Sequence, residues 1–74
     1  MPSYPATIDP DGDGFMVSFP DIPEALTGAA TREEAISMAA DALRVAMQFY
    51  AADGRAVPDP SEPLAGQVMI WLAE

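Results

Sequence analysis

Carboxylates are the only side chains in this sequence with much capacity for acid–base or metal chemistry. The 74 residues include twelve Asp and Glu but no His, Cys or Lys, which excludes the common nucleophile–base pairs, Schiff-base chemistry and Cys/His zinc sites. Five carboxylates lie in or beside predicted loops: Asp9, Asp11, Asp13, Asp21 and Glu24. Paired carboxylates can transfer protons or bind magnesium, but both need a pocket, and so short a chain has little room for one. We therefore predict no catalytic residues, no cofactor and no metal, and we interpret the protein as a non-enzyme.

The spacing Asp9-x-Asp11-x-Asp13-Gly14 matches the first six positions of a calcium-binding EF-hand loop. The twelfth position of such a loop supplies a bidentate Glu, whereas here it is Pro20. The flanking segments also have the pattern of strands rather than helices. We interpret the motif as the polar tip of a hairpin, in which Asp and Gly supply the turn geometry.

The charge balance is strongly acidic, with twelve Asp and Glu, three Arg and a formal net charge of −9. Phosphate binding depends on Arg and Lys, so we expect no direct nucleic-acid binding by this domain. An acidic surface favours encounter with a basic protein partner, although the same charge also serves solubility alone. No apolar run approaches the roughly 20 residues that span a bilayer, and no signal peptide is evident, so we expect a cytoplasmic protein without a membrane segment.

The carboxylates would be positioned by one small α+β domain that covers residues 1–74. We expect a three-stranded antiparallel meander, one long helix and a fourth strand, in the order β-β-β-α-β. Pro5 indicates that the first strand lies at an edge of the sheet or turns its amide side outward. The predicted elements are strands over 4–9, 15–19 and 25–29, a helix from the capping residue 31 to about 52, and a strand over 67–73.

The predicted helix has clear ends and two apolar faces. Thr31-x-x-Glu34 is a capping box at its start, and Gly54 occupies a position where a left-handed residue ends a helix. The face that should cover the sheet consists of Ile36, Ala39, Ala40, Leu43, Met47 and Tyr50. A second apolar stripe, roughly opposite, needs a cover of its own, which predicts self-association. This helix stripe consists of Met38, Ala42, Val45 and Phe49.

The last predicted strand is apolar on both faces, whereas a single helix covers only one face of a sheet. Three large side chains are therefore expected on the open face or at an edge of the sheet: Met16, Met69 and Trp71. Their exposure again implies association with another protein surface.

Three short motifs occur in a characteristic order: Phe19-Pro20-Asp21-Ile22-Pro23, then Thr27, then Thr31-x-x-Glu34-Ala35. In this order they resemble the HicB family of antitoxins, the inhibitory halves of bacterial toxin–antitoxin pairs. The resemblance covers about three-quarters of the chain and includes the Asp53-Gly54 helix stop and the Pro-x-Pro-Ser connector that ends at Ser61.

The resemblance implies a partial RNase H-like sheet without a working nuclease site. It also implies a partner, a small basic HicA-like toxin with a double-stranded-RNA-binding fold, which cleaves mRNA and whose active surface the antitoxin masks. The sequence departs from the family pattern where Glu24-Ala25 and Ala29-Ala30 replace Gly-containing pairs. Many relatives continue into a C-terminal DNA-binding domain, whereas this chain stops at Glu74, so we expect that domain to be absent from this chain.

We interpret the chain as a toxin-binding antitoxin domain that forms dimers or tetramers. The predicted toxin-binding residues combine acidic loops with apolar anchors: Asp9, Asp11, Asp13, Asp21, Glu24, Met16 and Trp71. Two alternatives remain open on the residues. One is a stand-alone homo-oligomeric interaction module without a toxin, and the other is a carboxylate- or metal-dependent hydrolase remnant.

Overall fold

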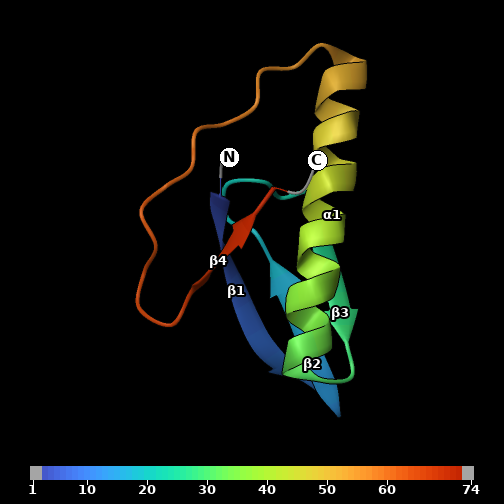
Figure 1. Cartoon of the computed structure of the whole chain (residues 1–74), viewed down its shortest axis with the longest axis vertical. Coiled ribbons are helices and arrows are strands. Elements are labelled where there is room, and N and C mark those ends of the chain that lie inside the picture. Colours follow the sequence, from blue (N-terminus) through green and yellow to red (C-terminus); the bar gives the residue numbers. More distant parts are fainter. Residues whose placement is uncertain (1–2, 73–74) are drawn as a thin grey trace.

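The computed structural model describes residues 3–72 and shows one antiparallel sheet packed against one long helix (Figure 1). The elements are β1 (Ser3–Asp11), β2 (Gly14–Ser18), β3 (Leu26–Ala29), α1 (Arg32–Asp53) and β4 (Val68–Trp71). The strands lie in the order β3-β2-β1-β4, which confirms the predicted α+β class and the β-β-β-α-β sequence of elements. Residue 73, the last of the predicted fourth strand, lies outside the described residues.

β1 is an inner strand, so of the two placements predicted from Pro5, an edge strand or an outward-facing amide side, the first is wrong. β1 pairs with β4 through Ser3–Ala6 and with β2 through Thr7–Asp11, and the two ladders are staggered along it. Pro5 therefore has a paired strand on one side only. Pro is usually confined to edge strands because it cannot donate a hydrogen bond to a neighbouring strand. An inner strand that is paired on only one side at Pro5 meets the same requirement.

The hairpin between β1 and β2 turns through Gly12 and Asp13. Asp11 lies opposite Gly14 in the register, so β1 extends two residues beyond its predicted end. Gly12 has a φ of 58°, whereas Asp13, like every non-glycine residue among 3–72, has a negative φ. A positive φ at the first turn residue only is the pattern of a type II′ turn with Gly in that position. Gly14 is required for another reason, because a Cβ there would lie 2.5 Å from the carbonyl oxygen of Ala29.

The ends of α1 follow the predicted capping signals. The Thr31 hydroxyl accepts a hydrogen bond from the Glu34 amide at 3.1 Å. At the other end Gly54 has a φ of 67°, and its amide donates to the Ala51 carbonyl at 3.2 Å. The Arg55 amide donates to the Tyr50 carbonyl at 3.0 Å, which completes a Schellman motif.

The core lies between α1 and the sheet and consists of apolar side chains. α1 buries five residues, at a spacing that repeats every three to four positions: Ala35, Ala39, Leu43, Ala46 and Tyr50. Three of these belong to the predicted face, whose other members Ile36, Ala40 and Met47 pack partly buried against the core. The prediction missed Ala35 and Ala46, which are small enough to let the helix approach the strands. No helix within residues 3–72 has the length and apolar character needed to cross a membrane.

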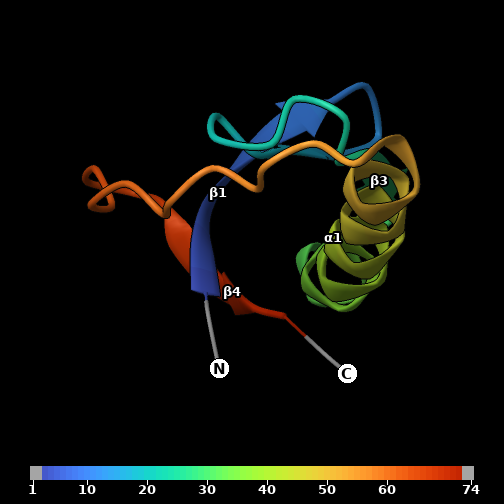
Figure 2. The same cartoon turned by 90° about the horizontal axis from the view of Figure 1, so that it is seen from above.

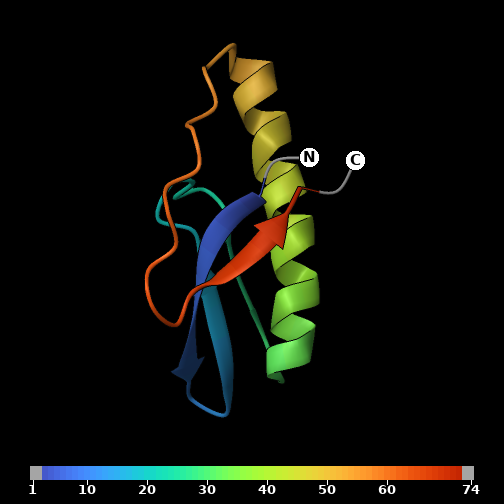
Figure 3. The same ribbon diagram turned by 60° about the vertical axis from the view of Figure 1, so that its left-hand side comes forward.

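The proline-rich connector between α1 and β4 lacks regular structure, as predicted, but side chains tie it to the sheet. The Tyr4 hydroxyl donates to the Pro58 carbonyl at 2.8 Å, and the Gln67 side-chain amide donates to the Thr7 hydroxyl at 3.1 Å. The connector crosses the end of the sheet and then lies on the side away from α1 before it enters β4 (Figures 2 and 3).

Candidate functional site

The structure places the five predicted toxin-binding carboxylates at two ends of the sheet. Asp9, Asp11 and Asp13 belong to the β1–β2 hairpin, whereas Asp21 and Glu24 lie in the β2–β3 loop, beyond the opposite end of β2. The sequence pattern predicted the loops correctly but could not show that β2 separates them. The two groups have different surroundings and are described separately.

The hairpin carboxylates form an exposed acidic tip. Asp9, Asp11 and Asp13 are all exposed, and within residues 3–72 no ion pair or side-chain hydrogen bond engages them. Met16 lies directly opposite Asp9 in the β1–β2 register and is 42 % exposed. Directly opposed residues share a face of the sheet, so an apolar side chain stands beside the acids.

The predicted apolar anchors lie on the open face, the one turned away from α1. Trp71 pairs with Ser3 and Met69 pairs with Pro5, so both share the face of β1 that carries Asp9. Trp71 is 61 % exposed and sits on the edge strand β4. Ser3 and Asp9 are six positions apart on β1, or roughly 20 Å, so Trp71 and Met16 are far apart on this face. The face is not open along its whole length, because Pro5, which lies between the two anchors, is fully buried.

The carboxylate of Asp21 is engaged within the molecule. It accepts hydrogen bonds from the Ser61 amide at 2.8 Å and from the Ser61 hydroxyl at 2.6 Å. These bonds join the β2–β3 loop to the connector, forty positions further along the chain. Asp21 therefore fixes the path of the connector.

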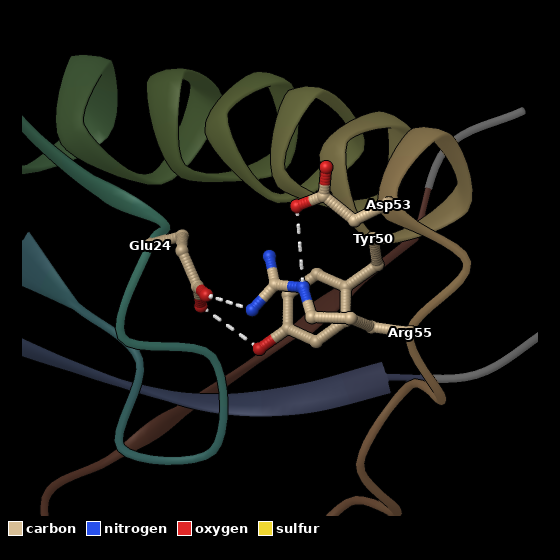
Figure 4. Close-up of polar contacts among 4 residues, drawn as sticks. All are labelled: Glu24, Tyr50, Asp53 and Arg55. Carbon is tan, nitrogen blue, oxygen red and sulfur yellow. Dashed lines mark hydrogen bonds and ion pairs between the residues drawn. The ribbon is translucent and has the colours of Figure 1, made fainter.

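Glu24 belongs to a polar cluster at the C-terminal end of α1 (Figure 4). Its two carboxylate oxygens accept hydrogen bonds from the Tyr50 hydroxyl at 2.8 Å and from the Arg55 guanidinium at 2.9 Å. Arg55 also lies 3.4 Å from a carboxylate oxygen of Asp53, and its guanidinium stacks 4.2 Å from the centre of the Tyr50 ring. The cluster ties the β2–β3 loop to the end of the helix.

The electrostatics of this cluster favour the ionised carboxylate. The hydrogen bond from Tyr50, and then that from Arg55, lower the pKa of Glu24 below its ordinary value. The same bond to Glu24 raises the pKa of Tyr50 and keeps its hydroxyl protonated as a donor. Sequence reasoning assigned Tyr50 only to the core and did not single out Arg55. The available signal was that Arg55 is one of three cations in the chain and follows the helix stop directly.

Three members of the helix stripe (Met38, Ala42, Val45 and Phe49) are exposed, as its spacing predicted, whereas Ala42 is half-buried, and the stripe adjoins β3. Met38 is 45 % exposed, Val45 37 % and Phe49 59 %. The stripe forms one wall of a surface groove of about 230 Å³, and the other wall includes Leu26 and Thr27 of β3. Glu24 lies at the rim of this groove. Within residues 3–72 no group of His, Cys, Asp and Glu has an arrangement suited to a metal ion.

These features define an acidic α+β domain with exposed surfaces suited to protein contacts. Consistent with that class, a family model described as the HicB-like antitoxin of a bacterial toxin–antitoxin system matches residues 3–73. The chain belongs to the HicB-like antitoxin family, as its motifs predicted.

Curated relatives support the same assignment. Antitoxin HicB 2 of Photorhabdus laumondii is 57 % identical over 58 residues, which are 78 % of this chain and 42 % of that protein. Antitoxin HicB of Escherichia coli (strain K12) is 51 % identical over 59 residues, which are 78 % of this chain and 43 % of that protein. The chain thus spans about two fifths of the length of these relatives. They are named antitoxins, a class that is not enzymatic, in agreement with the prediction of a non-enzyme.

Proposed function

We propose that this chain is the toxin-binding domain of an antitoxin, which acts in the cytoplasm on a small basic HicA-like toxin that cleaves mRNA. The observation that carries the proposal is the acidic hairpin tip, where Asp9, Asp11 and Asp13 are exposed and have no side-chain partner within residues 3–72. A toxin that holds RNA needs Lys and Arg for the phosphates. An acidic surface competes for the same cations and so masks the surface that binds RNA.

In this proposal the toxin contacts the open face of the sheet next to the hairpin. Charges at the tip steer the encounter, and the apolar anchors Met16 and Trp71 provide surface that becomes desolvated on binding. The roughly 20 Å between the two anchors suits a protein partner rather than a small molecule. Asp21 and Glu24 also belong to the predicted contact set. Because their carboxylates accept internal hydrogen bonds, we assign them mainly to holding the β2–β3 loop in place.

The domain itself is proposed to bind no nucleic acid. Two of its three arginines are neutralised by ion pairs, Arg44 with Asp41 and Arg55 with Glu24 and Asp53. The remaining cation, Arg32, stands beside Glu33 and Glu34 in the first turn of α1. We also propose that the sheet and helix are the partial RNase H-like fold of the family, here used as a binding scaffold.

The test is the association of this domain with the small basic protein encoded beside its gene, measured by stopped-flow or surface binding at several salt concentrations. A triple variant, Asp9→Asn, Asp11→Asn and Asp13→Asn, should slow association about tenfold at low salt and flatten its salt dependence. The matched control removes three charges at other exposed positions: Glu33→Gln, Asp59→Asn and Glu62→Gln. Equal effects of the two triple variants would refute the role of the tip, and failure of the wild-type domain to bind would refute the function.

A further inference from the structure

We propose that Leu64 is a third apolar anchor for the basic toxin, presented by a tight turn that the structure holds between the anchors Met16 and Trp71. This inference rests on the proposed function, because it concerns the same partner and the same side of the sheet. It assigns a binding role to the connector, which the predicted contact set did not include.

Leu64 has the largest exposed fraction among the large apolar side chains of residues 3–72. It is 73 % exposed, compared with 61 % for Trp71 and 42 % for Met16. A single exposed Leu on a mobile loop would be ordinary. Leu64 differs because hydrogen bonds hold its backbone in place. An apolar side chain on a fixed backbone can bind a partner at a low cost in ordering.

Leu64 begins a tight turn that ends at Gln67. The Gln67 amide donates a hydrogen bond to the Leu64 carbonyl at 3.1 Å, and Gly66 has a φ of 85°, as the third residue of a type II turn requires. The Leu64 amide in turn donates to the side-chain oxygen of Gln67 at 2.7 Å. Both backbone polar groups of Leu64 are therefore engaged within these four residues, which we call the Leu64 turn.

Gln67 also ties the Leu64 turn to the sheet. Its side-chain nitrogen donates to the Thr7 hydroxyl at 3.1 Å. Thr7 lies on β1 between Ser3 and Asp9, the two positions opposite the apolar anchors, and shares their face of the sheet. The connector here lies on the side of the sheet away from α1 (Figure 3). A partner that reaches both anchors must therefore pass the Leu64 turn.

The charge distribution favours a basic partner at this position. The three arginines of the chain lie on α1 or directly after it, at positions 32, 44 and 55. With four acids, residues 32–55 carry a net charge of −1, so the rest of the chain carries −8 of the total of −9. The strands, the hairpin and the connector beyond Arg55 contain no cation that would repel a basic surface placed over Leu64.

The test measures the association and dissociation rates of the domain with the small basic protein encoded beside its gene. Leu64→Ala should raise the Kd about tenfold, mainly through faster dissociation, and should leave the salt dependence unchanged because no charge is lost. Leu64→Met keeps the apolar volume and should bind within about twofold of the wild type. Met38→Ala, which removes an exposed apolar side chain from α1, is the second control and should bind as the wild type does.

Gln67 acts as a positioning residue, and a double-mutant cycle tests that role. Gln67→Ala removes the bonds to the Leu64 amide and to Thr7, so it should weaken binding about fivefold when Leu64 is present. In the Leu64→Ala background the same change should have almost no further effect. Equal effects in the two backgrounds would overturn the positioning role of the turn.

The free domain provides a measurement that needs no toxin. Nitrogen-15 relaxation should give the Leu64 amide an order parameter of about 0.85, as in rigid backbone, and Gln67→Ala should lower it toward about 0.6. A value below about 0.6 in the free wild type would overturn the held turn. Failure of the wild type to bind the basic protein would refute the proposed function, whereas equal binding by the wild type and Leu64→Ala would overturn the Leu64 proposal alone.

Discussion

Leu43 should be among the most costly side chains to truncate in this domain. It is completely buried and lies at the centre of the face of α1 that covers the sheet. Replacing a buried Leu by Ala removes apolar contacts and leaves a cavity, which costs about 3 kcal/mol in typical cores. At about 0.05–0.15 kcal/mol per residue, 74 residues give a total stability of roughly 4–11 kcal/mol, so Leu43→Ala removes a large share of it.

Thermal unfolding followed by circular dichroism measures this effect. A loss of about 3 kcal/mol lowers the melting temperature of a domain of this size by about 12–24 °C. Leu64→Ala is the matched control, because it makes the same chemical change at a side chain that is 73 % exposed. The control should stay within about 0.5 kcal/mol of the wild type. Both variants are compared at one protein concentration, since a dimer makes the melting temperature depend on concentration.

Equal melting temperatures for the two Leu variants would refute the reasoning. That result would mean that α1 is not packed on the sheet through Leu43. It would also remove the groove between α1 and β3, because that groove exists only if the helix lies where the core holds it.

Three further predictions concern the ties between elements. The lowered pKa of Glu24 means that its carboxylate stabilises the fold above its ordinary pKa of 4.5, and that this stabilisation is lost as pH falls through the lower folded value. Glu24→Gln should therefore flatten the acid side of a profile of melting temperature against pH. Thr31→Ala should cost about 1 kcal/mol in a denaturant titration by removing the N-cap, whereas Thr31→Ser should retain most of the stability. Gly14→Ala should displace β3, seen as amide shifts around Ala29, because its Cβ would meet the Ala29 carbonyl oxygen.

Local signals in the sequence predicted most of the fold. Alternation of apolar residues, the Thr31 cap and the Gly54 stop are short-range features, and each element formed where they indicated. Pro5 shows the limit of such reasoning. The sequence indicated that Pro5 must have one unpaired side. It could not indicate that β2 and β4 pair with different parts of β1, because this staggered pairing is a property of the assembled sheet.

The candidate surfaces were predicted less completely, for the same reason. The helix stripe followed from helical periodicity alone, and the exposure of Met38, Val45 and Phe49 agrees with that prediction. The acidic set mixed free carboxylates at the hairpin with Asp21 and Glu24, whose partners Ser61 and Arg55 lie 40 and 31 positions away in sequence. No local sequence pattern predicts hydrogen bonds between residues so far apart in the chain. An acid that holds two segments together therefore cannot be distinguished in the sequence from an acid that binds a partner protein.

The most direct test of the central proposal is an RNA-cleavage assay with the small basic protein encoded beside this chain. The proposal predicts that one equivalent of the wild-type domain abolishes cleavage, and that the Asp9, Asp11 and Asp13 triple variant needs a clear excess to do so. Cleavage that continues unchanged at a large excess of folded wild-type domain would contradict the claim that this acidic domain masks a toxin.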